Sequence, residues 1–520
     1  MIMKKRFYIT TPIYYASGNL HIGHLYTTTL AWVIANFKRL SGYEVKMLTG
    51  SDEHGLKIQQ KAKEKNVSPQ ELVDELSKKF IKMWEDFDIS YDIFQRTSYL
   101  DHKQKVQNIF SYFYKKGFIY KDKYQGLYSV SDEEFLTETQ AIKKDGKLCH
   151  PVSFKELTTV YEESYFFDMK AFVPWLVQYI DYHPNWLMPV KTKNELLSNF
   201  INIGLENLSV TRINIDWGIR VLEDTKHTLY VWLDALCNYI TALGYDVDDP
   251  NSPEFLKFWQ DENVEKVHLV GKEITRFHMI YWPIFLKALN ISLPTRIQSH
   301  GWILDQYGRK MSKSLNNVVD PYDLLQKYHP EMIKYYLATQ INFGDDGIFD
   351  ENRFVNVINS DLINNFGNLI SRTLKMKYLS FGSMSLKYYK TEYLEDIELE
   401  NNIDKHFKTY FNYFNEYQVD KALKEIISLS DSLNKYIDVV KPWTLKENLS
   451  RLEEILIRLL NGIYTIATCL QVVLPKKMEE VKNALGMNDL SFDLVLDFNK
   501  FNETTQKEKF MLFERINVKK

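Results

Sequence analysis

The feature that most constrains the fold is a strand-like segment near the amino terminus, followed by a long helical segment and a second strand-like segment. Residues 6–11 are rich in β-formers and are stopped by Pro12, so they predict a short buried strand. A Gly-containing turn at residues 16–19 leads into a predicted helix over residues 24–40, and residues 44–48 form the next predicted strand. This order and spacing predict an α/β fold with a parallel sheet.

The rest of the chain divides into regions that differ in composition and in the spacing of apolar residues. Residues 267–270 predict another buried strand, which precedes Gly271 and a helix. Between the two strand–helix regions, residues 121–224 are turn-rich and aromatic and include the hairpin-like sequence Lys144-Asp145-Gly146, which favours an insertion between two halves of one sheet. From residue 351, apolar residues recur every three or four positions and predict an α-helical bundle. The bundle core is expected to contain Leu423, Ile426, Ile427, Leu433, Ile437, Val440, Leu452, Ile455, Leu456, Leu459, Leu460 and Ile463.

Composition excludes several classes of protein. The net charge is −3, so any binding of a polyanion must use local patches among the 65 Lys and Arg residues. The three cysteines, at positions 149, 237 and 469, are far apart and form neither a disulfide framework nor a set of zinc ligands. No signal-peptide pattern is found, and the apolar runs are too short to span a membrane. We therefore expect a cytoplasmic protein without a membrane partner.

The sequence His21-Ile22-Gly23-His24 follows the first predicted strand, at the start of the long helix. Ligands of open α/β sheets bind beyond the carboxyl ends of the strands, where a helix amino terminus offers N–H groups to phosphate. Two imidazoles three residues apart can both donate hydrogen bonds to phosphate oxygens. The alternative is that the two histidines only cap the helix.

A second phosphate-directed motif occurs nearly three hundred residues later, at residues 308–314. This Gly-Arg-Lys-Met-Ser-Lys-Ser segment predicts a mobile loop, in which Lys310 and Lys313 are suited to a departing pyrophosphate. Taken alone, such a segment is more often a solvated basic loop. Because it occurs together with the motif at residues 21–24, we interpret the pair as a nucleotidyl-transfer site.

The two motifs together resemble the HIGH and KMSKS signatures of the class I aminoacyl-tRNA synthetases, in which they lie on two halves of a Rossmann-like domain separated by a connective insertion. The resemblance implies that the carboxylate of an amino acid attacks the α-phosphorus of ATP, with Mg²⁺ on the phosphates. It assigns catalysis to His21, His24, Lys310 and Lys313. It assigns ATP binding to these four residues and to Tyr14, Gly23 and Met311.

On this basis we expect a Rossmann-like parallel sheet that is split by a connective insertion and followed by an α-helical bundle. The expected regions are 1–120 and 225–295 as the two catalytic halves, 121–224 as the insertion, 296–350 as a stem-contact region with the KMSKS loop, and 351–520 as an anticodon-binding domain.

Longer segments look like the methionine branch of this family in particular. They are residues 10–18, 50–55 and 230–235, and the sequence Gly271-Lys272-Glu273-Ile274 followed by Phe277-His278. The resemblance implies a methionine pocket lined by Ile13, Tyr15, Trp232, Ala235, Tyr239, Ile274 and His278, with Asp52 receiving the ammonium group. Such residues suit an unbranched thioether side chain, and a buried cation requires an acidic partner. Without the resemblance, Trp232 and Tyr239 would be read as core residues.

The resemblance also implies recognition of tRNA(Met), both initiator and elongator, through its anticodon. Asn368 and Arg372 lie four residues apart on one predicted helix face, and Trp443 follows a proline. In the family, residues at these positions contact the anticodon, with the indole as a stacking platform. The alternatives are a surface pair on a helix and a tryptophan that seals the bundle.

The chain departs from many relatives in ways that affect metal binding and assembly. Ser129 stands where a zinc-ligand cysteine is expected, and Cys149 has no neighbouring cysteine, so we predict no zinc and no other protein-bound metal. Glu273 replaces a frequent aspartate. After residue 480, no β-rich stretch is long enough for a carboxyl-terminal oligonucleotide-binding domain, so we expect a monomer.

Three alternatives are left open by the sequence. Synthetases for leucine, isoleucine or valine usually carry a large editing domain, which the expected insertion is too short to contain, and cysteine enzymes need zinc ligands that are missing here. A small-molecule nucleotidyltransferase would not need the predicted bundle. A non-catalytic RNA-binding relative would not need intact His21, His24, Lys310 and Lys313.

Overall fold

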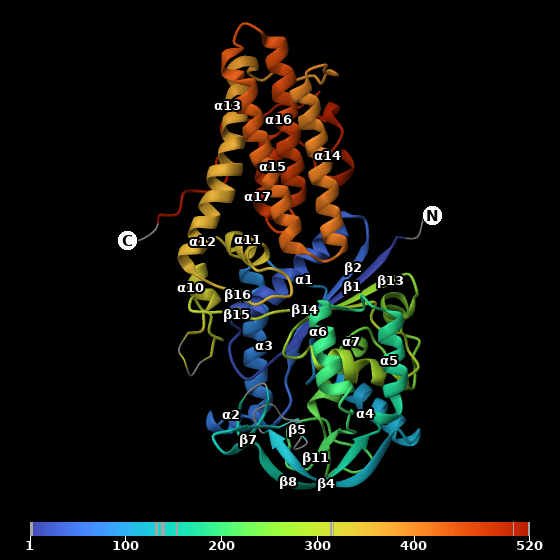
Figure 1. The fold of residues 1–520 in the computed structure, drawn as a ribbon. Helices are drawn as coiled ribbons and strands as arrows, with labels where there is room; N and C mark the ends of the chain where they lie inside the picture. Colours follow the sequence, from blue (N-terminus) through green and yellow to red (C-terminus); the bar gives the residue numbers. More distant parts are fainter. Residues whose placement is uncertain are drawn as a thin grey trace.

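The protein is elongated, with three regions arranged along one axis (Figure 1). The computed structural model describes residues 4–129, 134–136, 141–151, 154–312, 315, 317–502 and 504–517. A helical bundle lies at one end, an α/β region lies in the middle, and a small antiparallel sheet lies at the other end. Among the described residues, no helix is both long enough and apolar enough to cross a membrane.

The α/β region is built on a parallel sheet of six strands in the order β3-β2-β1-β13-β14-β9. The strands are β1 (Arg6–Tyr15), β2 (Glu44–Asp52), β3 (Ile93–Arg96), β9 (Leu187–Met188), β13 (Val264–Gly271) and β14 (Arg296–His300). The predicted order of strand, helix and strand is confirmed by β1, α1 (Ile22–Leu40) and β2. β1 pairs with β2 on one side and with β13 on the other, so the strand order reverses direction at β1.

Strand β1 continues to Tyr15, so the prediction that it ends at Pro12 was wrong. Its pairing with β2 shifts between Thr10 and Ile13 and then resumes with Ile13 opposite Gly50. Proline has no N–H to donate, and the strand passes it through an irregularity rather than ending there. The extension carries Ile13 and Tyr15 to the edge of the sheet where ligands bind.

Both faces of the sheet are covered. Phe7 and Ile9 belong to a buried cluster with α1 and the bundle, whereas Tyr8 belongs to a cluster on the opposite face, as strand alternation requires. The helices of this region are α2 (Leu56–Glu64), α3 (Pro69–Asp86), α4 (Leu100–Lys115), α7 (Val231–Thr241), α8 (Pro253–Phe255), α9 (Trp282–Ala288), α10 (Pro321–Leu325) and α11 (Pro330–Gln340).

The segment expected to be an insertion forms a separate antiparallel sheet in the order β10-β8-β4-β5. Its strands are β4 (Ile119–Ser129), β5 (Glu134–Leu136), β8 (Thr158–Phe167) and β10 (Leu208–Ser209), and the segment also contains α5 (Val173–Tyr182) and α6 (Val190–Leu196). A hairpin of β6 (Ile142–Lys144) and β7 (Lys147–Cys149) confirms the predicted turn, in which Asp145 and Gly146 both have positive φ. Strand β9 lies within the same sequence range but pairs with β14 of the central sheet.

The carboxyl-terminal region is an α-helical bundle, as predicted (Figure 1). Its helices are α12 (Glu351–Val357), η6 (Ile358–Gly367), α13 (Asn368–Phe381), α14 (Leu394–Asn415), α15 (Val419–Val440), α16 (Leu449–Leu470) and α17 (Pro475–Ala484). Of the twelve predicted core residues, all are buried except Val440, which lies at the end of α15 and is partly exposed.

Glu331 of α11 joins the bundle to the α/β region. Its buried carboxylate accepts hydrogen bonds from the backbone N–H groups of Lys476 (2.8 Å) and Lys477 (3.0 Å), in the first turn of α17. A carboxylate at this position both satisfies free N–H groups and complements the helix dipole. The bundle is therefore anchored to the catalytic region by a buried cap.

Candidate active site

A cavity of about 400 Å³ opens at the carboxyl ends of the parallel strands. The last residue of each of four strands lines it: Tyr15 of β1, Asp52 of β2, Gly271 of β13 and His300 of β14. This is the position where ligands bind in open parallel sheets, beside the strand at which the order reverses. The cavity therefore gathers residues from segments that are far apart in sequence.

His21 and His24 both line the cavity and also cap helix α1. His21 Nδ1 accepts a hydrogen bond from the Gly23 N–H at 3.1 Å, and His24 Nδ1 accepts one from the His21 N–H at 3.0 Å. The helix-capping interpretation is thus correct, and it does not exclude a role at the site. Because each Nδ1 is an acceptor, the proton of each ring in its neutral form lies on Nε2, the nitrogen that can donate to a phosphate oxygen.

The charge state of His24 follows from its surroundings. Burial, with a further contribution from His21, holds the pKa of the His24 imidazole well below its usual value. The edge of its ring meets the ring of Tyr14, with 4.9 Å between ring centres, and the Tyr14 hydroxyl is 2.6 Å from Oγ1 of Thr28. At neutral pH, His24 is therefore an uncharged hydrogen-bond donor held in a fixed orientation.

Lys310 and Met311 line the same cavity from the loop after β15 (Ile303–Leu304). The Lys310 ammonium lies over the Trp302 ring, 3.8 Å from its centre. Asp305 holds the loop together, because its carboxylate accepts hydrogen bonds from the Tyr307 N–H, the Arg309 N–H and the Asn317 amide. Of the two predicted catalytic lysines, Lys310 is thus at the site, whereas Lys313 lies outside the described residues.

All the residues expected to bind methionine line the cavity, and we call this part of its lining the slot. They are Ile13, Tyr15, Asp52, Trp232, Ala235, Tyr239, Ile274 and His278. The residues of α7 in this group lie three, four and seven positions apart, which places them on one helix face. The Trp232 ring stacks on Phe277, with 3.6 Å between ring centres. Most of this lining is apolar or aromatic.

The polar contacts of the slot involve two uncharged groups. The Tyr239 hydroxyl lies 2.7 Å from His278 Nε2, and His278 Nδ1 lies 3.0 Å from the Ile274 carbonyl oxygen. The carbonyl only accepts, so Nδ1 carries the proton and Nε2 accepts from the tyrosine. Burial lowers the pKa of His278 to about 4, which keeps its imidazole neutral at physiological pH. His278 thus brings no positive charge to the slot.

Asp52 is positioned by the residue that follows it. Glu53 is fully buried and accepts two hydrogen bonds from Arg96, at 2.7 and 3.0 Å, as well as one from Ser51. A bidentate Arg–carboxylate pair fixes both geometry and charge. It holds the end of β2 against β3, so Asp52, which is 8% exposed, is presented to the cavity from a rigid support.

Several lining residues were not predicted from the sequence. His300 and Trp302 line the cavity just before the loop of Lys310, and Glu273 accepts a hydrogen bond from the Trp302 indole at 2.8 Å. Lys57 lines it from α2. Their position in the sequence could have identified them, because His300 ends a strand and polar residues at the carboxyl ends of parallel strands face the ligand. None of these residues belongs to a motif that marks phosphate chemistry.

A second groove of about 670 Å³ adjoins the cavity. Tyr15, His21, His24 and Met311 line both, and Ser312 lines the groove only. The groove also has three lysines from α2 and α3 or their ends, which are Lys61, Lys65 and Lys79. The two histidines therefore lie between an apolar slot on one side and a basic groove on the other.

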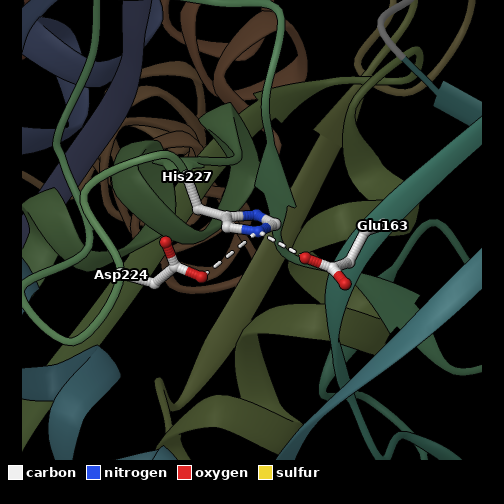
Figure 2. Close-up of side chains that lie close together, drawn as sticks. All are labelled: Glu163, Asp224 and His227. Carbon is white, nitrogen blue, oxygen red and sulfur yellow. Dashed lines mark ion pairs between the residues drawn. The ribbon is translucent and has the colours of Figure 1, made fainter.

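One group in the part of the chain that the structure describes, Glu163, Asp224 and His227, has the composition of a metal site (Figure 2). None of the three lines the cavity. His227 Nε2 is 3.7 Å from the carboxylates of Glu163 and Asp224. The Lys121 ammonium binds both carboxylates, at 2.7 and 2.8 Å, and balances their charge. A divalent cation would have to displace this ammonium, so the group is better described as an ionic link between β4, β8 and the segment before β12 (Thr228–Leu229).

The predicted anticodon residues lie in the bundle and not at the cavity. Asn368 begins α13, Arg372 follows one turn later, and the side chains of both are exposed. Trp443 lies in η7 (Pro442–Thr444), directly after α15, and its side chain is 47% exposed. The three residues therefore lie outside the cavity, and their role in binding the anticodon stays a prediction.

Two hydrogen bonds set the alignment of η6 with α15. The Asn365 side chain bonds to Asp431 at 2.8 Å and to Asn434 at 2.9 Å. The two helices run in the same direction, away from the α/β region (Figure 1). Two turns further on, α13 carries Arg372 while α15 reaches its end at Val440. Arg372 and Trp443 therefore lie at similar levels of the bundle.

Comparison with known proteins identifies the family to which the chain is similar. Residues 7–374 match the family described as tRNA synthetases class I (M). A methionine–tRNA ligase from Mycoplasmopsis pulmonis is 49% identical, over 99% of this chain and 100% of the relative. One from Bacillus subtilis is 42% identical, over 98% of this chain and 78% of the relative. The structure of Mycobacterium tuberculosis methionyl-tRNA synthetase in complex with methionyl-adenylate aligns with a TM-score of 0.92 and 33% identity, over 99% of this chain and 100% of that one.

The chain therefore belongs to the class I tRNA synthetases, and it has the Rossmann-like sheet and helical carboxyl-terminal region of that class. Within the class its full-length relatives are methionine–tRNA ligases, so it is a ligase of the methionine branch. This result replaces the three alternatives that the sequence left open, which were a sister synthetase, a small-molecule nucleotidyltransferase and a non-catalytic RNA-binding relative.

Proposed function

We propose that this chain activates methionine with ATP in the cavity between β1 and α7, and then transfers the methionyl group to the 3′-terminal adenosine of tRNA(Met). The observation that carries the proposal is that one cavity is lined by His21, His24 and Lys310 as well as by Asp52 and the apolar residues of the slot. A nucleotide and a small hydrophobic amino acid are thereby brought into contact. Initiator and elongator tRNA would be charged by the same reaction.

The slot supports the choice of amino acid. An unbranched thioether is uncharged and flexible, and its sulfur is favoured near aromatic ring edges. The neutral Tyr239–His278 pair and the Trp232 ring supply such an environment. Asp52 would bind the ammonium group, because a buried cation without a partner costs several kcal/mol. Ile13, Tyr15, Ala235 and Ile274 would complete the contacts with the side chain.

The chemical step would need no general base. In adenylation, a carboxylate oxygen of methionine bonds to the α-phosphorus of ATP while the bond from that phosphorus to the bridging oxygen of pyrophosphate breaks. Negative charge grows on the phosphate oxygens, and the Nε2–H groups of His21 and His24 would stabilise it together with Lys310. Lys313 would act on the departing pyrophosphate. Tyr14, Gly23 and Met311 would contact ATP.

Metal requirements follow from the types of side chain at the site. Among the cavity residues assigned to phosphate are imidazoles and a lysine, which donate to phosphate oxygens, whereas Mg²⁺ prefers oxygen ligands. Mg²⁺ is therefore proposed to enter on the phosphates of ATP, where it would neutralise charge. No zinc is expected, because Cys149 is a lone buried cysteine and Ser129 is not a zinc ligand. Elemental analysis that found one zinc per purified chain would contradict this expectation.

The bundle would select the tRNA. Exposed loop bases are read by stacking and by hydrogen bonds to their edges. Trp443 offers an exposed indole for stacking, and Asn368 and Arg372 offer polar groups on one face of α13. We propose that the chain acts as a monomer.

The test is ATP–pyrophosphate exchange with each of the twenty amino acids in turn. Methionine alone should give rapid exchange, and methionine should then be transferred to tRNA in a charging assay. Exchange that is independent of any amino acid, or that is fastest with a β-branched amino acid, would contradict the proposed substrate.

A further inference from the structure

Asp234 lies on the face of α7 that points away from the methionine slot. The residues of α7 that line the cavity are Val231, Trp232, Ala235, Leu236 and Tyr239, whereas Asp234 does not line it and is 1% exposed. Its two carboxylate oxygens have separate partners. Oδ2 is 2.6 Å from Nδ1 of His54, and Oδ1 is 2.7 Å from Nε2 of His102. Both histidines are buried, and neither lines the cavity.

These contacts join the parts of the protein that form the slot. His54 follows Asp52 by two residues, directly after β2, and His102 lies in the first turn of α4. His102 also returns to α7, because its Nδ1 lies 2.8 Å from Oγ1 of Thr241, two turns beyond Asp234. The carboxylate thus links the segment that presents Asp52 to the helix that presents the apolar wall.

The charge of Asp234 strengthens this link. Burial alone would raise its pKa, but the two histidines outweigh burial and lower the pKa of Asp234 to about 2, so the carboxylate is ionised at neutral pH. Hydrogen bonds to an ionised acceptor are roughly twice as strong as neutral ones. Among the described residues, His54 Nε2 has no hydrogen-bond partner, so Asp234 is the only group that fixes the orientation of this ring by hydrogen bonding.

We propose that Asp234 is a positioning residue for methionine: by binding His54 and His102, it sets the spacing between Asp52 and the wall formed by Trp232, Ala235 and Tyr239. Methionine must meet both sides of the slot at once, through its ammonium group and through its thioether. The link contacts neither the substrate nor the phosphate groups. It therefore governs the affinity for methionine and leaves the binding of ATP unchanged. This inference rests on the proposed function.

The test is Asp234→Asn, which keeps the size of the side chain but removes its charge and one acceptor oxygen. Because a small misplacement of a binding group has large effects, we expect the KM for methionine in pyrophosphate exchange to rise about tenfold. The KM for ATP should change less than about twofold, since the histidines at residues 21 and 24 are held by their own capping bonds. An unchanged KM for methionine, or equal rises of both KM values, would overturn the proposal.

A matched control separates positioning from stability. Asp396 is likewise fully buried and ionically paired, with Arg451 of the bundle, so Asp396→Asn makes the same change in another domain. It should lower the melting temperature without raising the KM for methionine. If the Asp396 and Asp234 variants raise that KM equally, the effect is a general consequence of destabilisation and the proposal fails.

A second pair of variants keeps the inference testable if Asp234→Asn does not fold. In His102→Gln, the amide nitrogen reaches about as far as Nε2 and keeps a donor for Asp234, whereas His102→Leu removes it. The KM for methionine should stay near the wild-type value in the first variant and rise in the second. Equal KM values in the two variants would overturn the role of this bond. Absence of methionine-dependent exchange in the wild-type protein would instead contradict the proposed function.

Discussion

The Tyr239 hydroxyl donates a hydrogen bond to Nε2 of His278, at 2.7 Å, and both side chains line the cavity. Tyr239→Phe removes the donor and leaves a buried acceptor unsatisfied, at a cost of about 1–3 kcal/mol. We expect the KM for methionine in pyrophosphate exchange to rise about tenfold, because the imidazole loses its fixed orientation. Tyr8→Phe is the control, since the Tyr8 hydroxyl is also buried but bonds to the Tyr239 carbonyl outside the cavity. Equal KM values in the two variants would contradict the assignment of the slot.

The lowered pKa of His278 predicts a dependence of stability on pH. This pKa is about 4 in the folded protein, against about 6.5 for an unfolded chain, so the unfolded state binds the proton more tightly. The neutral His278 imidazole contributes fully to the free energy of unfolding above pH about 6.5. This contribution is lost as the pH falls toward about 4, with about 2 kcal/mol lost by pH 5. Melting temperatures of the wild type and of His278→Gln, measured from pH 7.5 to 4.5, should converge toward low pH. Parallel curves would show that this imidazole does not govern the change.

Removal of the Lys310 ammonium should slow adenylate formation and spare amino-acid binding. We expect Lys310→Met to lower the single-turnover rate by about a hundredfold, because a charge aimed at the transition state is lost. The KM for methionine should be nearly unchanged. Lys327→Met is the control, because Lys327 pairs with Glu351 away from the cavity. A similar loss is predicted from the sequence for Lys313→Met, and a normal rate in either catalytic variant would remove that lysine from the mechanism.

Trp443→Ala should affect tRNA charging only. The indole is 47% exposed in a turn at the end of α15, so its removal does not open the core. It does remove base stacking that contributes about 1–3 kcal/mol to tRNA binding. The KM for tRNA should therefore rise about tenfold or more, with pyrophosphate exchange unchanged. Tyr182→Ala, at another exposed aromatic residue that lies in α5 and not in the bundle, should change neither reaction. Equal losses of both reactions in the Trp443 variant would indicate a folding defect.

Gly50 is predicted to tolerate no side chain. A Cβ at this position would lie 1.9 Å from the Gln95 carbonyl oxygen, a backbone atom of β3 that cannot move aside alone. We expect Gly50→Ala to destabilise the protein by about 3 kcal/mol or more in urea denaturation. Gly117→Ala provides the comparison, because Gly117 has a φ of +78° but open space around it. Its cost should be about 1–2 kcal/mol, from backbone strain alone. Similar costs at both positions would contradict the contact.

The sequence predicted those parts of the fold that depend on local periodicity. The apolar spacing of residues 452–463 identified the core face of α16, and the Asp-Gly turn identified the β6–β7 hairpin. Pro12 misled the prediction of β1, because the effect of a proline depends on whether the neighbouring strand accommodates a shift in register. Such accommodation is a property of two strands, and one strand alone does not reveal it.

The site was predictable to the extent that its residues lie in motifs. The resemblance named His21, His24, Lys310 and the residues of the slot, and the structure brings them into one cavity. It gave no role to Asp234, His54 or His102, although the matched segments 50–55 and 230–235 contain the first two. Their pairing joins positions separated by more than a hundred residues, and no local pattern marks a buried carboxylate that binds two imidazoles.

The position of β1 beside β13 has a consequence for synthesis of the protein. Translation produces β1 long before Val264, where its neighbour begins, so a growing chain exposes one unpaired edge of β1 until the ribosome has passed that point. An unpaired edge invites mispairing with other chains. The antiparallel sheet at the far end can fold during this interval, whereas the nucleotide cleft cannot close before residue 311 has emerged. Stalling of the ribosome between residues 130 and 260 should therefore yield nascent chains that chaperones retain.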